Sequence, residues 1–149
     1  MGMNTVVAKG SGVTIPTVAL PSEAVPPLTL ADVRAVLDAR VISCLDLGVT
    51  VAGVVAADLM SDVLVVHQPG AVLLTGLATV QAVRTAAIAD LAAVILVSGK
   101  RPAPDVTALA EEEHVPLFVT SLPMFEAAGA LFSALAAARG PAPTPQADG

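Results

Sequence analysis

The chain has 149 residues, 55% of them hydrophobic and 13% charged, with a net charge of −6 at pH 7 and a mean hydropathy of +0.81. This length suits one domain with a sizeable core. A membrane span is not expected, because Asp90 and the turn 67–69 interrupt the longest apolar runs before they reach about 20 residues. The negative charge repels phosphate backbones, so we expect no direct binding of nucleic acid.

Cysteine usage and the first residues favour a cytoplasmic protein. Cys44 is the single cysteine and has no partner for an internal disulfide, which suits a reducing compartment. The residues after Met1 lack the basic segment and apolar core of a signal peptide.

Glycine and proline recur throughout residues 1–27, which predicts an extended or flexible arm. The β-prone stretch 13–20 within it can dock along a sheet edge of its own domain or of a neighbour. A disordered leader is an equally good interpretation. Residues 28–140 form the predicted α/β domain, and the proline-rich residues 141–149 a disordered tail.

Helical and strand patterns alternate through residues 28–140. A first helix is expected after the cap Thr29, and strands over 41–44 and 50–56. Asp58 is expected to cap a helical turn over 58–62, followed by a strand over 72–75. Thr79 is expected to cap a helix reaching about residue 90.

The second half continues the alternation with a strand over 93–97, a helix from Pro104 to about residue 113, a strand over 117–120 and a helix over 123–139. Continuous apolar strands are buried on both faces, and crossover helices between them imply parallel pairing. We therefore predict a three-layer α/β fold with a mostly parallel sheet of about five strands, flanked by helices and carrying an extended N-terminal arm.

Catalytic and metal motifs are incomplete. Ser98-Gly-Lys-Arg101 resembles the end of a phosphate-binding P-loop but lacks the first glycine and the hydroxyl residue. No G-x-G-x-x-G turn or nucleophile elbow occurs, and the two histidines, His67 and His114, are remote from each other. We expect no enzyme, no metal and no cofactor.

Small and polar residues follow the predicted strands, where open parallel sheets place their ligands. Asp58 and Asp62 are four positions apart, which puts both on one side of a helical turn, although backbone capping explains them as well. The pair Lys100-Arg101 can contact an anion, although a solvated pair of loop cations explains it as well. The expected ligand-binding rim comprises Asp58, Ser61, Asp62, Thr75, Gly76, Ser98, Gly99, Lys100, Thr120 and Ser121.

Several segments between Leu28 and about Leu135 together resemble the DRTGG domain. They are the opening Leu28-Thr-Leu, Asp58-Leu-Met-Ser-Asp-Val63, the Leu-Leu-Thr-Gly at 73–76, Ser98-Gly99 and the Glu-Glu-Glu-His-Val-Pro at 111–116. Such domains occur alone and inside CBS-domain pyrophosphatases and phosphotransacetylases, and are similar to the non-catalytic N-terminal domain of HPr kinase. A weaker resemblance is to the N-terminal domain of PucR-type regulators.

The chain departs from the motif that gives that family its name. At the position of Asp-Arg-x-Val-Thr-Gly-Gly it reads Gly48-Val-Thr-Val-Ala-Gly-Val54, which keeps Val51 and Gly53 and loses the other defined residues.

Two functions follow as hypotheses. One is a non-enzymatic regulatory module that senses a small anionic or nucleotide-like ligand at the rim. The other is a homodimerising interaction protein that docks on an enzyme complex without a small-molecule ligand. The resemblance implies that such domains pair with one another, and the last helix, with Met124, Phe125, Leu131 and Phe132, is a candidate interface, although burial in the core explains these residues as well.

Overall fold

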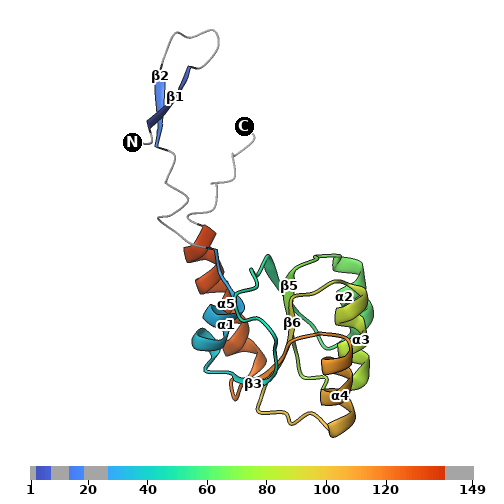
Figure 1. The fold of residues 1–149 in the computed structure, drawn as a ribbon. Helices are drawn as coiled ribbons and strands as arrows, with labels where there is room; N and C mark the ends of the chain where they lie inside the picture. Colours follow the sequence, from blue (N-terminus) through green and yellow to red (C-terminus); the bar gives the residue numbers. More distant parts are fainter. Residues whose placement is uncertain (1–2, 8–13, 19–26, 140–149) are drawn as a thin grey trace, which may run out of the picture.

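Five strands form the central sheet, in the order β3-β7-β6-β5-β4. The computed structural model describes residues 3–7, 14–18 and 27–139 (Figure 1). The strands are β3 (Arg40–Ser43), β4 (Gly53–Ala56), β5 (Ala71–Thr75), β6 (Ala93–Leu96) and β7 (Leu117–Val119). Strands β4, β5, β6 and β7 pair in parallel, whereas β3 runs antiparallel to β7 at one edge. The predicted mostly parallel sheet is confirmed.

The three inner strands are buried along their whole length. Their sequences, AVLLT, AVIL and LFV, are continuous apolar runs, and both faces of a parallel sheet are covered by helices. The apolar sequences of these three strands therefore indicate that both faces of the sheet are buried there, as predicted.

Helices cover both faces of the sheet and complete the three layers (Figure 1). On one face α1 (Leu30–Leu37) and α5 (Met124–Arg139) pack against Val72, Leu74 and Ile95. On the other face α2 (Met60–Val66), α3 (Val80–Ile88) and α4 (Pro104–Glu112) pack against Leu73, Val94 and Leu96. Alternate residues of one strand thus supply two separate cores.

Local capping agrees with the sequence at two helices and differs at a third. Thr29 caps α1 in a reciprocal capping box with Asp32, and Pro104 opens α4. The predicted turn at 58–62 is wrong in its extent and its cap, because the helix is Met60–Val66 and Leu59 occupies the N-cap position. The Asp58 carboxylate instead binds the end of the neighbouring strand.

Two further strands, β1 (Met3–Val7) and β2 (Thr14–Val18), pair antiparallel with each other in the extended N-terminal arm. The remainder of that arm up to residue 26 and the predicted tail at 141–149 lie outside the described residues. Among the helices of the described ranges, none has the length and apolar character needed to cross a membrane.

Candidate functional site

The carboxyl ends of the parallel strands β4 to β7 meet at one edge of the sheet, and Asp58 organises this edge. Its Oδ1 accepts the backbone N–H of Gly76 at 2.7 Å and the hydroxyl of Thr75 at 3.2 Å. The Thr75 hydroxyl oxygen in turn accepts the N–H of Leu77 at 3.1 Å. Asp58 thus ties the segment after β4 to the end of β5, 17 and 18 positions away.

The loop after β6 is held in an unusual backbone conformation. Ser98 and Gly99 both have positive φ, at 60° and 65°. The Ser98 N–H donates to the Leu122 carbonyl at 2.8 Å, and the Gly99 N–H to the Thr120 carbonyl at 2.9 Å. Left-handed backbone is costly for a serine. Those two bonds to the loop after β7 fix the turn and place Lys100 at its exposed end.

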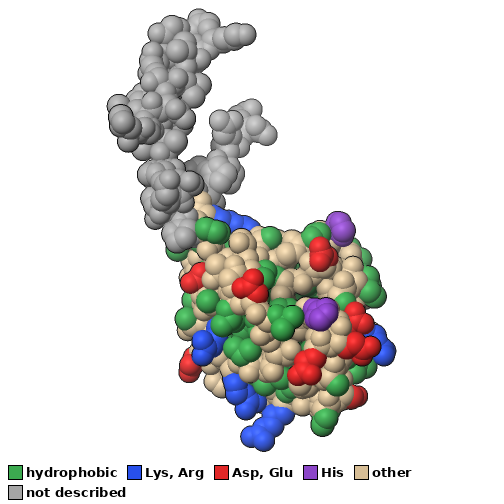
Figure 2. Space-filling model, in the orientation of Figure 1, with side chains coloured by type: hydrophobic (Ala, Val, Ile, Leu, Met, Phe, Trp, Pro, Cys, Tyr) green, Lys and Arg blue, Asp and Glu red, His purple; other side chains and the backbone are tan. Residues whose placement is uncertain are grey.

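An open cavity of about 380 Å³, which we call the carboxyl-edge cavity, lies between these two loops and the start of α5. Four of the predicted rim residues contribute to it, namely Asp58, Gly76, Ser98 and Lys100. The cavity therefore contains a carboxylate and an ammonium group. Basic side chains gather at the lower end of the face in Figure 2, which is the end at which α5 begins in Figure 1.

The other six predicted rim residues do not line this cavity. Thr75 is fully buried beneath it and positions Asp58. Thr120 is buried and donates to the Leu37 carbonyl at 2.7 Å, which anchors the end of α1. Ser61, Asp62, Gly99 and Ser121 also lie outside the lining. Gly99 belongs to the same loop as Lys100.

Three apolar residues complete the lining and were not predicted: Leu77, Val97 and Met124. Leu77 directly follows Gly76, and Val97 directly precedes Ser98. The rule that ligands bind at the carboxyl ends of parallel strands could therefore have predicted both residues. Met124 comes from the first turn of α5, and only the packing of that helix against the sheet brings it here.

The two family-motif positions kept in this chain have packing roles at the amino edge of the sheet. Val51 is buried, and Gly53 lies beneath the side chain of Gln68. A Cβ at Gly53 would be 1.9 Å from Gln68 Nε2, so a larger residue here would have to displace the end of the Gln68 side chain. None of the motif positions 48–54 lines the carboxyl-edge cavity.

Comparison with known proteins gives matches of two kinds, to a family model and to solved structures. The model of the DRTGG domain family matches residues 32–134. No curated protein matches the chain.

Among solved structures, the chain is similar to the CBS and DRTGG domains of the regulatory region of Clostridium perfringens pyrophosphatase, solved with the activator diadenosine tetraphosphate. The TM-score is 0.58 at 16% identity, over 69% of this chain and 45% of that chain. The chain thus spans less than half of that regulatory region, and the likeness concerns the fold. Because the family model covers more than half of its length, the chain belongs to the DRTGG domain family.

Proposed function

We propose that this DRTGG domain is a non-enzymatic regulatory module that senses a nucleotide-like phosphate ester at the carboxyl-edge cavity. The observation that carries the proposal is the presence of Asp58 and Lys100 in the lining of one cavity. A simple anion would be attracted by the lysine and repelled by the carboxylate. A ligand that carries both hydroxyl groups and a phosphate satisfies both side chains.

The hydrogen bonds around Asp58 support this assignment. Its Oδ1 is occupied by Gly76 and Thr75, and its carboxylate has further lone pairs to accept ligand hydroxyls. Leu77, Val97 and Met124 supply apolar surface for a sugar or a base. The similar pyrophosphatase region was solved with a nucleotide activator, which agrees with this ligand class.

The same cavity offers little for catalysis. Its lining contains no histidine or cysteine, and its serine is not paired with a base. In the parts of the chain that the structure describes, no group of three or more His, Cys, Asp or Glu side chains can hold a metal ion. We therefore propose sensing rather than turnover, in a cytoplasmic protein.

Thermal unfolding in the presence of mono- and dinucleotides, sugar phosphates and inorganic phosphate tests the proposal. The chain has no Trp or Tyr, so unfolding is followed by circular dichroism. A ligand at a hundred times its Kd adds about 2.7 kcal/mol, which raises Tm by roughly 5 °C or more. A nucleotide should produce this rise and inorganic phosphate should not. Equal Tm values across the panel would contradict the proposal.

A second candidate function is that of an interaction protein that homodimerises through α5 and docks on an enzyme complex. Phe125 and Phe132 lie seven positions apart on this helix and are 85% and 75% exposed, whereas Leu131 is buried. Between them, a Cβ at Gly129 would meet only open space. Exposed aromatic residues in one stripe are typical of interfaces.

Sedimentation velocity across a concentration series tests this candidate. The Phe125→Ser/Phe132→Ser variant should sediment as a monomer at concentrations at which the native chain is a dimer. Val65→Ser on α2 is a matched control, because Val65 is 83% exposed. A native chain that stays monomeric would exclude dimerisation through α5.

A further inference from the structure

Helix α5 carries a regular stripe of exposed residues. Its exposed positions include Phe125, Gly129, Phe132 and Ala136, whereas Leu131 is buried. Spacings of four, three and four positions keep the first four of these residues on one face of an α-helix. We call them the α5 stripe, in which two large side chains alternate with two small residues. In Figure 1 the helix lies beside α1 at the left side of the domain.

The α5 stripe is complementary to itself when two copies of the helix run antiparallel. About a twofold axis at the midpoint between Gly129 and Phe132, Phe132 of one copy faces Gly129 of the other. Phe125 lies four positions before Gly129, and Ala136 lies four positions after Phe132. Phe125 therefore faces Ala136 of the other copy. Each phenylalanine meets a small residue, and each of these contacts occurs twice in a symmetric dimer.

Gly129 has no evident role within its own chain. Its φ is not positive, so the backbone conformation does not require a glycine. A Cβ at this position would meet no atom of the described residues within 4 Å, so packing inside the domain does not require one either. Glycine in the interior of a helix is less favourable than alanine. The close approach of a phenylalanine ring from a second copy explains why this position lacks a side chain.

Charge favours the antiparallel over the parallel orientation. Glu126 is exposed next to the α5 stripe, and a parallel pair in register would bring its two copies side by side. In the antiparallel pair position 126 faces position 135, so the two carboxylates are about 13.5 Å apart along the helix axis. This exceeds the screening length of about 8 Å at physiological ionic strength. Antiparallel helices also bring opposite ends of their dipoles together.

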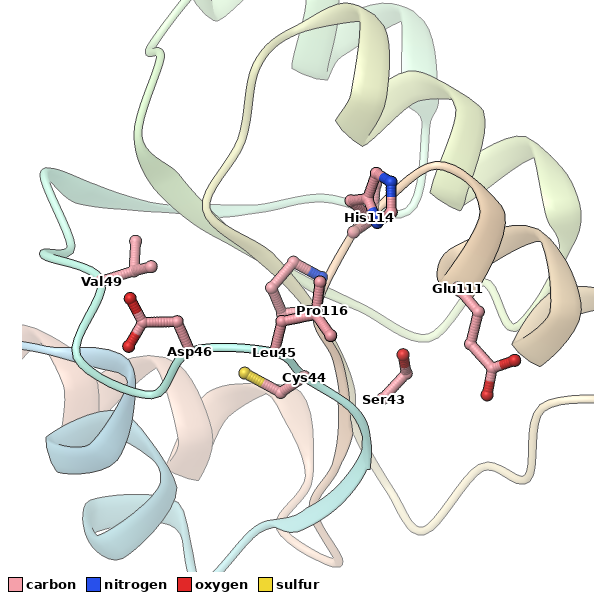
Figure 3. A pocket seen from close by; sticks show the side chains of 9 residues that line it. Ser43, Cys44, Leu45, Asp46, Val49, Glu111, His114 and Pro116 are labelled. Atoms are coloured by element: carbon pink, nitrogen blue, oxygen red, sulfur yellow. The ribbon is translucent and has the colours of Figure 1, made fainter.

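Other exposed apolar residues lack such an arrangement. Residues 64–66 are consecutive on α2, so their side chains point in different directions around the helix. Leu45 is 86% exposed and belongs to a cavity of about 250 Å³, lined by residues from the stretches 43–49 and 111–116 (Figure 3). The same lining contains the carboxylates of Asp46 and Glu111. A second copy docked there would bury charges without partners, which is costly.

We propose that two copies of this chain pair through the α5 stripe as antiparallel helices, with Phe132 against Gly129 and Phe125 against Ala136. The proposal rests on the second candidate function and adds its orientation and register. At about 200 Å² for each phenylalanine, exposed fractions of 85% and 75% provide roughly 640 Å² in the dimer. Stable interfaces bury at least about 1,200 Å², so flanking residues must supply the rest and the dimer should depend on concentration.

Disulfide cross-linking tests the orientation. Phe125→Cys and Ala136→Cys are made separately in the full chain carrying Cys44→Ser, which removes its single native thiol. In a glutathione redox buffer, a mixture of the two variants should form the mixed disulfide well above the proportion expected from random pairing. The reason is that positions 125 and 136 face each other, and a disulfide needs Cα atoms within about 7 Å. Mass spectrometry distinguishes the mixed dimer from the two homodimers.

Gly129→Leu tests the register at the centre of the pair. Leucine favours a helix more than glycine does, and its side chain has open space in the single chain, so the fold should persist. It would occupy the place of Phe132 of the second copy, so the Kd of the dimer should rise at least about tenfold in sedimentation velocity. Ala137→Leu is the matched control. Ala137 is exposed outside the α5 stripe, so its variant should keep the Kd within about twofold.

The outcomes separate this proposal from the second candidate function. A native chain that stays monomeric overturns both. A native dimer whose cysteine variants form homodimers in preference to the mixed disulfide overturns the antiparallel orientation alone. A dimer that Gly129→Leu weakens no more than Ala137→Leu does overturns the register alone.

Discussion

Thr75 and Thr120 occupy corresponding places at the ends of two strands, yet their hydroxyl groups serve different parts of the molecule. Each is buried, and each hydroxyl oxygen accepts the N–H two positions later, at 3.1 Å from Leu77 and 3.2 Å from Leu122. Thr75 donates to the Asp58 carboxylate in the cavity wall, whereas Thr120 donates to the Leu37 carbonyl of α1. The same local turn therefore positions a candidate site in one case and a helix in the other.

The largest effect on stability should come from Thr120→Val. This change leaves the Leu37 carbonyl and the Leu122 N–H without their partner in the interior, and we expect a loss of about 2–3 kcal/mol in unfolding free energy. Urea denaturation followed by circular dichroism measures it. Ser121→Ala, at the exposed next position, should change the value by less than about 0.5 kcal/mol. Equal stabilities for the two variants would show that the Thr120 hydroxyl has no anchoring role.

Thr75→Val should have a smaller effect on stability, about 1 kcal/mol. The Asp58 carboxylate is exposed and keeps the Gly76 N–H, so water can replace the lost hydroxyl there, and the remaining loss comes from the Leu77 N–H. The affinity for the nucleotide should fall in this variant, because Asp58 loses one of the two groups that orient it. Calorimetric titration of Thr75→Val and Ser121→Ala separates the two effects. A variant as unstable as Thr120→Val with native affinity would reverse the roles assigned to the two threonines.

At the opposite edge of the sheet, Gly53→Ala should cost about 1 kcal/mol, since the new Cβ displaces the Gln68 amide group. Gln68 is a flexible side chain, so the additional change Gln68→Ala should restore most of the loss. Urea denaturation of the two single variants and the double variant gives their coupling energy. A coupling near zero would mean that Gly53 is required for another reason.

The smallest effect on stability, within about 0.5 kcal/mol, is expected for Lys100→Ala, because Lys100 is exposed. Its effect on nucleotide affinity should be a weakening of about five- to tenfold if the ammonium contacts a phosphate. Arg101→Ala is the matched control, since Arg101 is the exposed neighbouring cation and does not line the cavity. Equal affinities of the two variants would remove Lys100 from the site.

The sequence predicts the layers of this fold well because burial on both faces leaves a local signal. The runs AVLLT and AVIL are apolar at every position or nearly so, which distinguishes them from strands exposed on one face. The antiparallel direction of β3 leaves no such signal, because it depends on which strand β3 pairs with. It is visible only in the structure.

The position of the candidate site in the fold could be predicted from the sequence, whereas only some of the residues that line it could. Parallel strands put the residues after them at one edge, and Asp58, Gly76 and Ser98 line one cavity there. The partners of individual polar groups depend on contacts between distant segments. Asp58 binds residues 17 and 18 positions away instead of capping its own helix, and Thr120 binds a carbonyl 83 positions away.

Titration of the ¹⁵N-labelled chain with adenosine 5′-monophosphate tests the central claim most directly, because amide shifts locate the ligand as well as detect it. We expect saturable shifts concentrated at Gly76, Leu77 and residues 98–100, with little change at residues 44–49 and 111–115. An absence of saturable shifts at millimolar nucleotide, or shifts concentrated at residues 44–49 and 111–115, would contradict a phosphate-ester site at the carboxyl edge of the sheet.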